Sequence, residues 1–312
     1  MSNHLPCCFI VNPMSAGGRT RTRWESYTPQ LKQALGDISV RYTEGVGSAT
    51  QLTQQAIDDG YRIIVSVGGD GTNNEVLNGV MDPSGQLRHP DVQFAFFPMG
   101  SGVDLRRSLP SASSIPELIL QVQQGKVRNL DVGKVTFQSK DGGEQSRFFL
   151  NISSVGMSSM VTAAINQSKK PLGGTVAYLW YSLIAMIRFK NPMMKVQLGD
   201  APLLDGRQNL IIVGNGKYFG GGMKAAPEAE MDDGFFDVVV IGDYSSFELV
   251  MNGSKVYSGT HVHLPKTQVH RVSSLTIETD RPIPIDIDGE LLGQPKAQYE
   301  MVPGILPVRL PA

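Results

Sequence analysis

Residues 61–81 join a short apolar strand, a glycine-rich corner and a helix, and they constrain the fold more than any other stretch. The segment reads YRIIVSVGGDGTNNEVLNGVM. The β-branched run Ile63 to Val67 predicts a buried strand, and Val76, Leu77 and Val80 recur at the spacing of one helix face. A strand, a tight turn and a helix in this order are typical of an α/β domain.

The corner itself, Gly68-Gly69-Asp70-Gly71, favours a phosphate ligand. Glycines let the backbone turn sharply and approach a ligand closely. The first N–H groups of the following helix have no partner within the helix, and they face the ligand with a favourable dipole. Because Asp70 alone would repel a phosphate, a cation is expected between them. The corner therefore indicates a nucleoside triphosphate with Mg²⁺. The alternative is a turn that only closes a βα unit, since neither a P-loop nor a dinucleotide fingerprint is present.

Composition narrows the class of protein. The 312 residues suit two domains, and 28 Lys plus Arg against 29 Asp plus Glu give no case for nucleic-acid binding. The two cysteines, Cys7 and Cys8, exclude a disulfide framework and are expected in a buried first strand. A reducing, cytoplasmic location follows as the simplest expectation. No signal peptide is visible, and the longest apolar stretch, 176–187, is too short to span a bilayer.

Strand and helix signals alternate in the first part of the chain, which predicts a mostly parallel sheet covered by helices. Ligands bind beyond the carboxyl ends of such strands, so the loops after Val11, Val67 and Phe97 are expected to converge. The expected strands are 7–11, 39–43, 63–67 and 92–97, and the expected helices are 22–35, 49–59 and 115–124.

From about residue 128 short strands dominate and predict an antiparallel β domain. We expect an α/β domain at 1–128, a β-sandwich domain at 129–303, and a final segment, 304–312, that returns to the first domain. The expected strands are 129–137, 147–153, 195–198, 208–213, 235–241, 274–279 and 283–287, with helices at 175–188 and 246–257.

Six ordered motifs connect these parts to a known family. They are Val11 to Gly18, Gly68 to Val76, Pro98 to Asp104, Gly214 to Gly222, Pro227 to Asp237 and Asp286 to Glu290. In these motifs the chain resembles the diacylglycerol kinase catalytic-domain superfamily, in particular the bacterial soluble lipid kinases and the sphingosine kinases.

The resemblance implies a nucleotide domain and a lipid domain with the active site in the cleft between them, and ATP and Mg²⁺ as cofactors. It places the ATP phosphates against the glycine corner and assigns Thr43 to the ribose or adenine side. The implied nucleotide-binding residues are Thr43, Gly68, Gly69, Asp70, Gly71, Thr72, Asn73, Asn74, Ser101 and Asp104.

The same resemblance implies a structural Mg²⁺ near the Asp-Asp-Gly segment. Its ligands would be the Asp233 carboxylate and the backbone carbonyls of Glu230 and Phe235. Asp131 would join a polar network behind the phosphates.

Transfer of a phosphoryl group to a hydroxyl requires a group that takes the proton of that hydroxyl. The resemblance implies Glu290 in this role, and Asp70 is the second candidate. The alternative for Glu290 is a solvated side chain on a hairpin turn. Asp286 and Asp288 are weaker candidates, because an alternating Asp-Ile-Asp strand often turns its carboxylates to water.

The helix at 175–188 is apolar nearly all round, which is usual for buried core. The alternative is a helix that lines an acyl-chain cleft or touches a bilayer, with Arg188 and Lys190 close to anionic headgroups. His261 and His263 could pair as metal ligands on a strand face, but ordinary packing or surface positions are favoured because no third ligand is evident.

The predicted function is an ATP-dependent kinase of a membrane lipid such as diacylglycerol, sphingosine or phosphatidylglycerol, associated transiently with a membrane surface. A homodimer is compatible with the sequence. Val103 stands where many relatives carry a polar Asn, so a catalytically silent lipid- or nucleotide-binding module is one alternative. A kinase of a soluble acceptor such as NAD is another.

Overall fold

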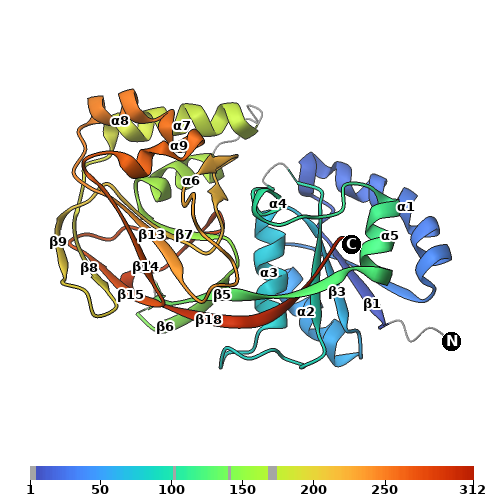
Figure 1. Cartoon of the computed structure of the whole chain (residues 1–312). Coiled ribbons are helices and arrows are strands. Elements are labelled where there is room, and N and C mark those ends of the chain that lie inside the picture. Colours follow the sequence, from blue (N-terminus) through green and yellow to red (C-terminus); the bar gives the residue numbers. More distant parts are fainter. Residues whose placement is uncertain (1–4, 101–102, 140–141, 168–173) are drawn as a thin grey trace. The chain divides into compact units, whose positions relative to one another are not determined.

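The structure is a computed structural model that describes residues 5–100, 103–139, 142–167 and 174–312. The chain divides into two compact units, of which the first comprises Met1–Leu130 with Gly304–Ala312 and the second comprises Asp131–Pro303. The fold class expected from the sequence, an α/β unit followed by a unit of antiparallel sheets, is confirmed (Figure 1).

The first unit is built on a parallel sheet in the order β2-β1-β3-β4-β18. Strand β2 lies on one side of β1 in the sheet, and the next strand of the chain, β3, lies on the other side. The order of strands therefore reverses at β1, and sheets of this kind bind ligands at such a reversal. The elements are β1 (Cys7–Val11), η1 (Ser15–Gly18), α1 (Arg19–Leu35), β2 (Ile38–Tyr42), α2 (Ser48–Asp58), β3 (Ile63–Gly68), α3 (Asp70–Val80), β4 (Gln93–Pro98), α4 (Leu105–Ser108) and α5 (Ile115–Gln124).

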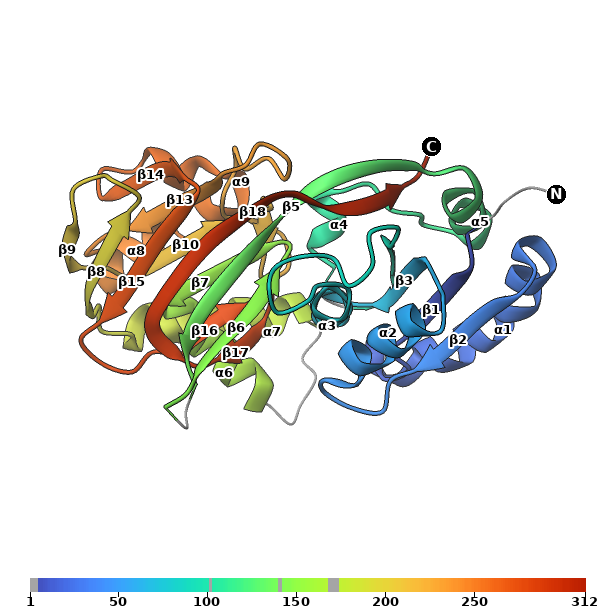
Figure 2. The ribbon, with the colours of Figure 1, turned by 90° about the horizontal axis from the view of Figure 1, so that it is seen from below.

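Helices cover both faces of this sheet (Figure 2). Alternate strand residues explain the arrangement, since successive side chains of a strand point to opposite faces. Phe9 and Val65 pack on one face with Trp24 of α1 and Leu118 of α5. The ring centroids of Phe9 and Trp24 lie 5.3 Å apart.

Cys7 and Cys8 are both free and buried in β1, as the sequence predicts. Burial raises the pKa of both thiols. The two residues therefore contribute small side chains to the core of the sheet.

Two large antiparallel sheets make up most of the described second unit. One runs β14-β13-β10-β7-β16-β17, and the other joins β18, β15, β8 and β9 with β5 and β6. Strands β11 and β12 form a small two-stranded sheet of their own. The elements are β5 (Lys126–Gln138), β6 (Glu144–Phe149), β7 (Ile152–Gly156), α6 (Met157–Gln167), α7 (Gly174–Arg188), β8 (Met193–Leu198), β9 (Leu204–Arg207), β10 (Leu210–Gly214), β11 (Tyr218–Phe219), β12 (Met223–Lys224), β13 (Phe236–Ile241), α8 (Ser246–Asn252), α9 (Lys255–Ser258), η2 (Thr260–His263), β14 (Thr267–Val272), β15 (Ser274–Thr279), β16 (Ile285–Ile287), β17 (Glu290–Leu292) and β18 (Gln294–Leu310).

Strand β10 shows why the first of these sheets is buried on both faces. Ile211 and Val213 pack in a core shared with residues of the other sheet, such as Val196 and Ile277. Leu210 and Ile212 point the opposite way. That second face also lines an apolar cavity together with residues of α6, α7, α8 and α9. The unit is therefore a sandwich with a helical layer on one outer side.

Two expected elements are corrected by the structure. The strand predicted at 147–153 is two strands, because β6 pairs with β5 whereas β7 pairs with β10 and β16. The helix predicted at 246–257 is interrupted at Gly253 and Ser254, where α8 ends and α9 begins.

Candidate functional site

The corner between β3 and α3 depends on glycines because other backbone and side-chain atoms lie close to it. A Cβ on Gly68 would lie 2.4 Å from the Thr72 hydroxyl oxygen. A Cβ on Gly100, in the loop after β4, would lie 2.7 Å from the Gly69 Cα. The loops after β3 and β4 therefore touch backbone to backbone, as expected from the sequence for the carboxyl ends of neighbouring strands.

The loop after β1 joins the same place through Asn12. Its side-chain amide donates to the Thr72 hydroxyl at 3.1 Å, and its side-chain oxygen accepts the Met14 N–H at 3.0 Å. The next residues include Ala16 with a φ of 52° and Gly17 and Gly18 with φ of 70° and 84°. A non-glycine residue in this region is unusual and is often found at functional sites. Asn12 was not among the predicted site residues, although it lies in the first motif.

Asp70 uses its carboxylate to hold the loop after β4. Its two oxygens accept the backbone N–H groups of Asp104 and Leu105 at 2.8 and 3.3 Å. Asp104 in turn pairs with Arg107 at 3.3 Å. Both acidic residues are thus held by protein donors in this structure. Their roles toward a cation or as a base stay predictions.

Glu75 of α3 holds the loop after β2, which begins at Thr43. The Glu75 oxygens accept the N–H groups of Gly47 and Ala49 at 2.8 and 2.9 Å, and the side chain is 7% exposed. Since α2 has no side-chain cap of its own, this carboxylate satisfies amides at its start. The sequence analysis did not single out Glu75. The only feature of the sequence that could have indicated it is an acidic residue on the apolar face of a predicted helix.

The remaining residues predicted to bind the nucleotide lie at the start of α3 or outside the residues that the structure describes. Asn73 and Asn74 are buried, and Asn74 accepts a hydrogen bond from the Asn78 side chain at 3.2 Å. The Asn73 side-chain oxygen is buried and has no hydrogen-bond partner among the described residues. Ser101 lies outside the described residues.

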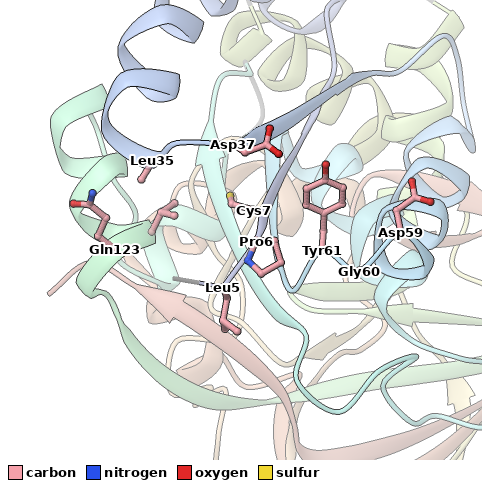
Figure 3. Close-up of a pocket in the computed structure, with 10 residues that line it drawn as sticks. Leu5, Pro6, Cys7, Leu35, Asp37, Asp59, Gly60, Tyr61 and Gln123 are labelled. Carbon is pink, nitrogen blue, oxygen red and sulfur yellow. The ribbon is translucent and has the colours of Figure 1, made fainter. Parts of the chain in front are cut away.

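A cavity of about 430 Å³ lies at the opposite, amino ends of β1 and β3 (Figure 3). Asp37, Asp59 and Tyr61 line it, but both carboxylates are exposed and Asp59 pairs with Arg41 at 2.6 Å. This place lies at the end of the strands opposite to the glycine corner.

In the second unit, Glu290 begins the strand after a two-residue hairpin turn. Ile287 and Glu290 pair across the turn, and Asp288 and Gly289 have φ of 49° and 89°. Positive φ at both central residues is the hairpin geometry that matches the twist of the flanking strands. Glu290 is partly exposed and pairs with Arg147 of β6 at 3.2 Å.

Asp286 is buried, so the sequence expectation that it turns to water is wrong, whereas Asp288 is partly exposed. Asp288 accepts the N–H groups of Leu150 and Ile152 at 3.4 and 3.0 Å. Asp286 accepts the Thr162 hydroxyl at 2.5 Å and the Gly289 N–H at 3.0 Å.

Burial raises the pKa of Asp286 to about 6. The hydrogen bonds of the two carboxylates fix the turn that carries Glu290, and those made by Asp286 offset part of the cost of burying it.

The segment at 230–237 carries the predicted structural metal site. Asp233 accepts the Phe235 N–H at 3.0 Å and pairs with Arg271. Asp131 accepts the Gly234 N–H at 2.7 Å, so it supports this segment. Asp237 is buried, with one carboxylate oxygen lacking a hydrogen-bond partner in the described chain, and burial raises its pKa to about 6.

The oxygen atoms of this segment are of the kind that Mg²⁺ prefers. Asp237 offers an orphaned, buried carboxylate oxygen, whereas the Asp233 carboxylate is already paired with Arg271. Nowhere in the described residues do three or more His, Cys, Asp or Glu side chains converge on one metal position. The predicted set differs from such a cluster, because it contains one carboxylate and two carbonyls.

His261 and His263 lie in η2 rather than on a strand face. His261 is buried, its Nε2 lies 3.1 Å from the Ala225 carbonyl oxygen, and burial lowers its pKa. His263 is exposed. The packing and surface positions favoured by the sequence agree with this placement.

An apolar cavity of about 550 Å³ lies between the first sheet of this unit and its helices. Members of α6, α7, α8 and α9 line it, among them Val161, Met186, Leu249 and Val256. The volume is that of a small-molecule site, and the lining suits an apolar ligand.

Residues 180–188 of helix α7 are not buried core, which corrects the expectation favoured by their composition. Among these residues, the part of the helix whose side chains are described, Ala185 is the one buried side chain, whereas Trp180 and Ile187 are exposed. The helix covers the cavity on one side and meets solvent on the other. None of the helices in the described residues combines the length and apolar character that crossing a membrane requires.

Comparison with known proteins agrees with both units. Residues 6–135 match the diacylglycerol kinase catalytic domain, and residues 151–310 match the YegS C-terminal NAD kinase beta sandwich-like domain. The chain therefore belongs to the diacylglycerol kinase family, and its enzyme class is that of a lipid kinase.

Individual relatives are distant but cover nearly the whole chain. A diacylglycerol kinase of Staphylococcus carnosus is 25% identical over 93% of this chain and 90% of its own length. One of Staphylococcus epidermidis is 26% identical over 93% and 87%.

Solved structures share the fold. A diacylglycerol kinase of Bacillus anthracis is 24% identical with a TM-score of 0.74, covering 99% of this chain and 98% of its own. The yeast NADH kinase is 10% identical with a TM-score of 0.60, covering 100% and 84%.

Proposed function

We propose that the protein transfers the terminal phosphoryl group of ATP to the hydroxyl group of a membrane lipid, with diacylglycerol as the first acceptor to test. Family membership supports kinase chemistry. The observation that carries the lipid acceptor is the apolar cavity of about 550 Å³ in the unit that also holds Glu290. An acyl chain is the kind of ligand that such a lining accepts.

The first unit would hold the nucleotide. Amides at the start of α3 and the loops after β1, β2 and β4 supply donors for phosphate oxygens, and oriented N–H groups stabilise negative charge during phosphoryl transfer. Asn12, Asp70 and Glu75 keep these loops in place through the hydrogen bonds described above.

Glu290 would act as general base. In the reaction, the acceptor hydroxyl oxygen forms the new bond to the γ-phosphorus, the bond between that phosphorus and the β–γ bridging oxygen breaks, and the hydroxyl proton passes to the Glu290 carboxylate. Arg147 orients that carboxylate, and the turn is held by Asp286 and Asp288.

Mg²⁺ is expected as cofactor because it neutralises phosphate charge in kinases. A second Mg²⁺ would brace the segment at 230–235, held by the Asp233 carboxylate and the carbonyls of Glu230 and Phe235 with Asp237 close by. The orphaned oxygen of Asp237 supports this placement.

A kinase of a soluble acceptor is the second candidate, favoured by the structural likeness to yeast NADH kinase. That likeness concerns the fold, whereas a large apolar cavity has no role in binding a charged dinucleotide. A silent binding module is disfavoured by the support that the structure gives to the Glu290 turn.

The test is incubation of the protein with Mg²⁺, radiolabelled ATP and a total lipid extract, followed by mass spectrometry of the labelled products. Glu290→Gln is expected to reduce turnover by about 10²–10⁴-fold, the usual contribution of a positioned base. Glu278→Gln, an exposed glutamate on β15, is the matched control and is expected to leave turnover unchanged.

Two results would overturn the proposal. One is phosphorylation of NAD without phosphorylation of any lipid. The other is a Glu290→Gln variant that retains wild-type turnover while its circular dichroism and urea midpoint match those of the native protein.

A further inference from the structure

Helix α6 has one stripe of residues at the apolar cavity and a neighbouring stripe at the hairpin that carries Glu290. Ser158 and Val161 line the cavity. Ser159 and Thr162, each one position further along the helix, bond to the first strand of the hairpin and to the residue before it. Because residues three apart lie on one face of a helix, the two pairs define two adjacent stripes of α6. The same helix therefore meets both the cavity and the hairpin.

The contacts between α6 and the hairpin are short and buried. The Thr162 hydroxyl donates to the Asp286 carboxylate at 2.5 Å, and the Ser159 hydroxyl donates to the Pro284 carbonyl at 2.5 Å. Thr162 and Asp286 are 7% and 5% exposed. A hydrogen bond to a charged acceptor in such a place is one of the stronger kind. Figure 2 shows α6 beside β16 and β17, and these hydrogen bonds attach it to the hairpin.

The register of the sheet explains why Asp286 faces α6. Asp286 of β16 pairs directly with Ser154 of β7, so the two side chains point to the same face of the sheet. The Ser154 hydroxyl lies 2.8 Å from the hydroxyl of Ser158, which lines the cavity. Ile285 and Ile287 point the opposite way, into the core between the two sheets. The Asp286 carboxylate therefore lies on the side of the sheet that carries α6 and the cavity.

The same carboxylate also reaches the turn of the hairpin. The Asp286 oxygen that does not bond to Thr162 accepts the Gly289 N–H at 3.0 Å. Gly289 is a central residue of the turn, and Glu290 follows it directly. One side chain thus bridges α6 and the turn. A shift of α6 would reach Glu290 through two hydrogen bonds and one peptide unit.

We propose that Asp286 is a positioning residue that couples filling of the apolar cavity to the placement of Glu290. A chain in the cavity packs against α6, and α6 holds the turn through Thr162 and Asp286. Since a ligand shifts a structure only by binding one arrangement better than another, the filled cavity favours the arrangement of α6 in which Thr162 holds Asp286.

The coupling rests on the proposed function, in which the cavity takes the acyl chain and Glu290 takes the hydroxyl proton. Its consequence is that the acyl chain contributes to the rate of the chemical step as well as to binding. Binding energy from a remote part of a substrate acts in this way when it orients the reacting groups, and a truncated substrate then loses kcat and not only affinity.

The first test compares dihexanoyl and didecanoyl glycerol in the same detergent micelles at about pH 8, where the Asp286 carboxyl, with a pKa of about 6, is ionised. For the native protein the longer chains are expected to lower KM and to raise kcat. Thr162→Val preserves the size of the side chain and removes the hydroxyl group. It should keep the gain in KM, whereas kcat on the longer chains falls about tenfold, which corresponds to about 1.4 kcal/mol and to the loss of one hydrogen bond. A loss of stability alone would lower kcat by the same factor on both substrates.

Rescue variants separate the hydrogen bond from the packing of the side chain. Thr162→Ser restores the hydroxyl, and Asp286→Asn keeps an oxygen for the Gly289 N–H while its NH₂ group donates to the Thr162 hydroxyl oxygen. Both are expected to keep the gain in kcat on the longer chains. Ser159→Ala removes the other bond between α6 and the hairpin, and it takes the place of Thr162→Val if that variant does not fold.

The matched control is Thr53→Val in the first unit. Thr53 is buried on α2, and its hydroxyl has no hydrogen-bond partner among the described residues. The same change of chemistry at this position is expected to leave KM and kcat unchanged for both chain lengths.

The second test needs no catalysis. Methyl laurate has an apolar chain and no hydroxyl group to accept a phosphoryl group. Hydrogen exchange of the hairpin amides at 287–291 is expected to slow at least about fivefold when methyl laurate is added to the native protein, which is the lower end of typical coupling between two sites. In Thr162→Val the slower exchange should persist in α8, where Leu249 lines the cavity, and disappear from the hairpin.

The outcomes separate this coupling from the proposed function. A gain in kcat with chain length that Thr162→Val retains, or a native kcat that does not change with chain length, refutes the coupling and leaves the lipid kinase standing. Protection of the hairpin by methyl laurate that depends on Thr162, with no lipid phosphorylated, supports the coupling and refutes the kinase function. Methyl laurate that protects neither α8 nor the hairpin refutes the coupling.

Discussion

The carboxylate of Glu75 offers a sharp test of how the predicted nucleotide loops are held. It lies on α3 and accepts two backbone N–H groups, those of Gly47 and Ala49, at 2.8 and 2.9 Å. The substitution Glu75→Gln preserves the size of the side chain. It leaves one oxygen for one amide and turns an NH₂ group toward the other.

The expected cost follows from these contacts. A hydrogen bond to a charged group contributes about 1.5–3 kcal/mol to stability, and losing it leaves a buried N–H unsatisfied. Glu75→Gln should therefore lower the free energy of unfolding by about 1.5–3 kcal/mol. Domains are typically stable by about 5–15 kcal/mol, so the variant should still fold.

Urea unfolding measures this change, with a lower midpoint expected at an unchanged slope. The matched control is Glu25→Gln, because Glu25 is exposed and its pair with Arg21 at 3.1 Å lies on the surface. Such pairs contribute about 0–1 kcal/mol. Calorimetry should also show weaker ATP binding for Glu75→Gln than for the control, since the loop after Thr43 loses its anchor. A Glu75→Gln variant as stable as the control would refute the reasoning.

Two further predictions concern stability. Burial raises the pKa of Asp286 from 3.8 to about 6, so the native state holds this proton more tightly than the unfolded chain, and stability falls as pH rises from about 4 to 6. The loss of unfolding free energy over this range should be roughly 3 kcal/mol at most, and the substitution Asp286→Asn should remove it. Urea unfolding at several pH values measures the effect, and parallel curves of stability against pH for both proteins would contradict it. Gly79→Ala should destabilise the protein by about 1–3 kcal/mol despite the better helix propensity of Ala, because the new Cβ would lie 2.5 Å from the Thr53 Cβ. A higher urea midpoint for this variant would show that α2 and α3 can separate.

The sequence predicted the α/β unit well because its signals are local. The apolar run at 63–67 and the glycines after it specify a strand and a turn without help from distant residues. The helix at 115–124 was predicted with its observed bounds, and Ser114 caps it through its side chain as such residues commonly do.

The second unit was harder to predict because its structure depends on pairing between distant residues. One apolar run at 147–153 reads as a single strand, and only the partners β5, β10 and β16 divide it between two sheets. Helix α6 was missed, since Ser and β-branched residues weaken its helical signal. The exposure of α7 was also missed, because composition cannot show which apolar helix lacks a covering layer.

The site shows the same limit. The glycine corner and Glu290 were recognised from motifs, but the anchoring roles of Glu75, Asp286 and Asp288 arise from hydrogen bonds to residues far away in sequence. Those partners are visible only once the chain is folded.

The interrupted first unit has a consequence for biosynthesis. Its last strand is supplied by residues 304–310, where Val308 pairs with Phe94 of β4. While the ribosome is still making the second unit, β4 lacks this partner and presents an unprotected strand edge, which is a site for aggregation. The sheet of the first unit is therefore complete only after residues 304–310 have been made, and until then the edge of β4 is open to pairing with another strand.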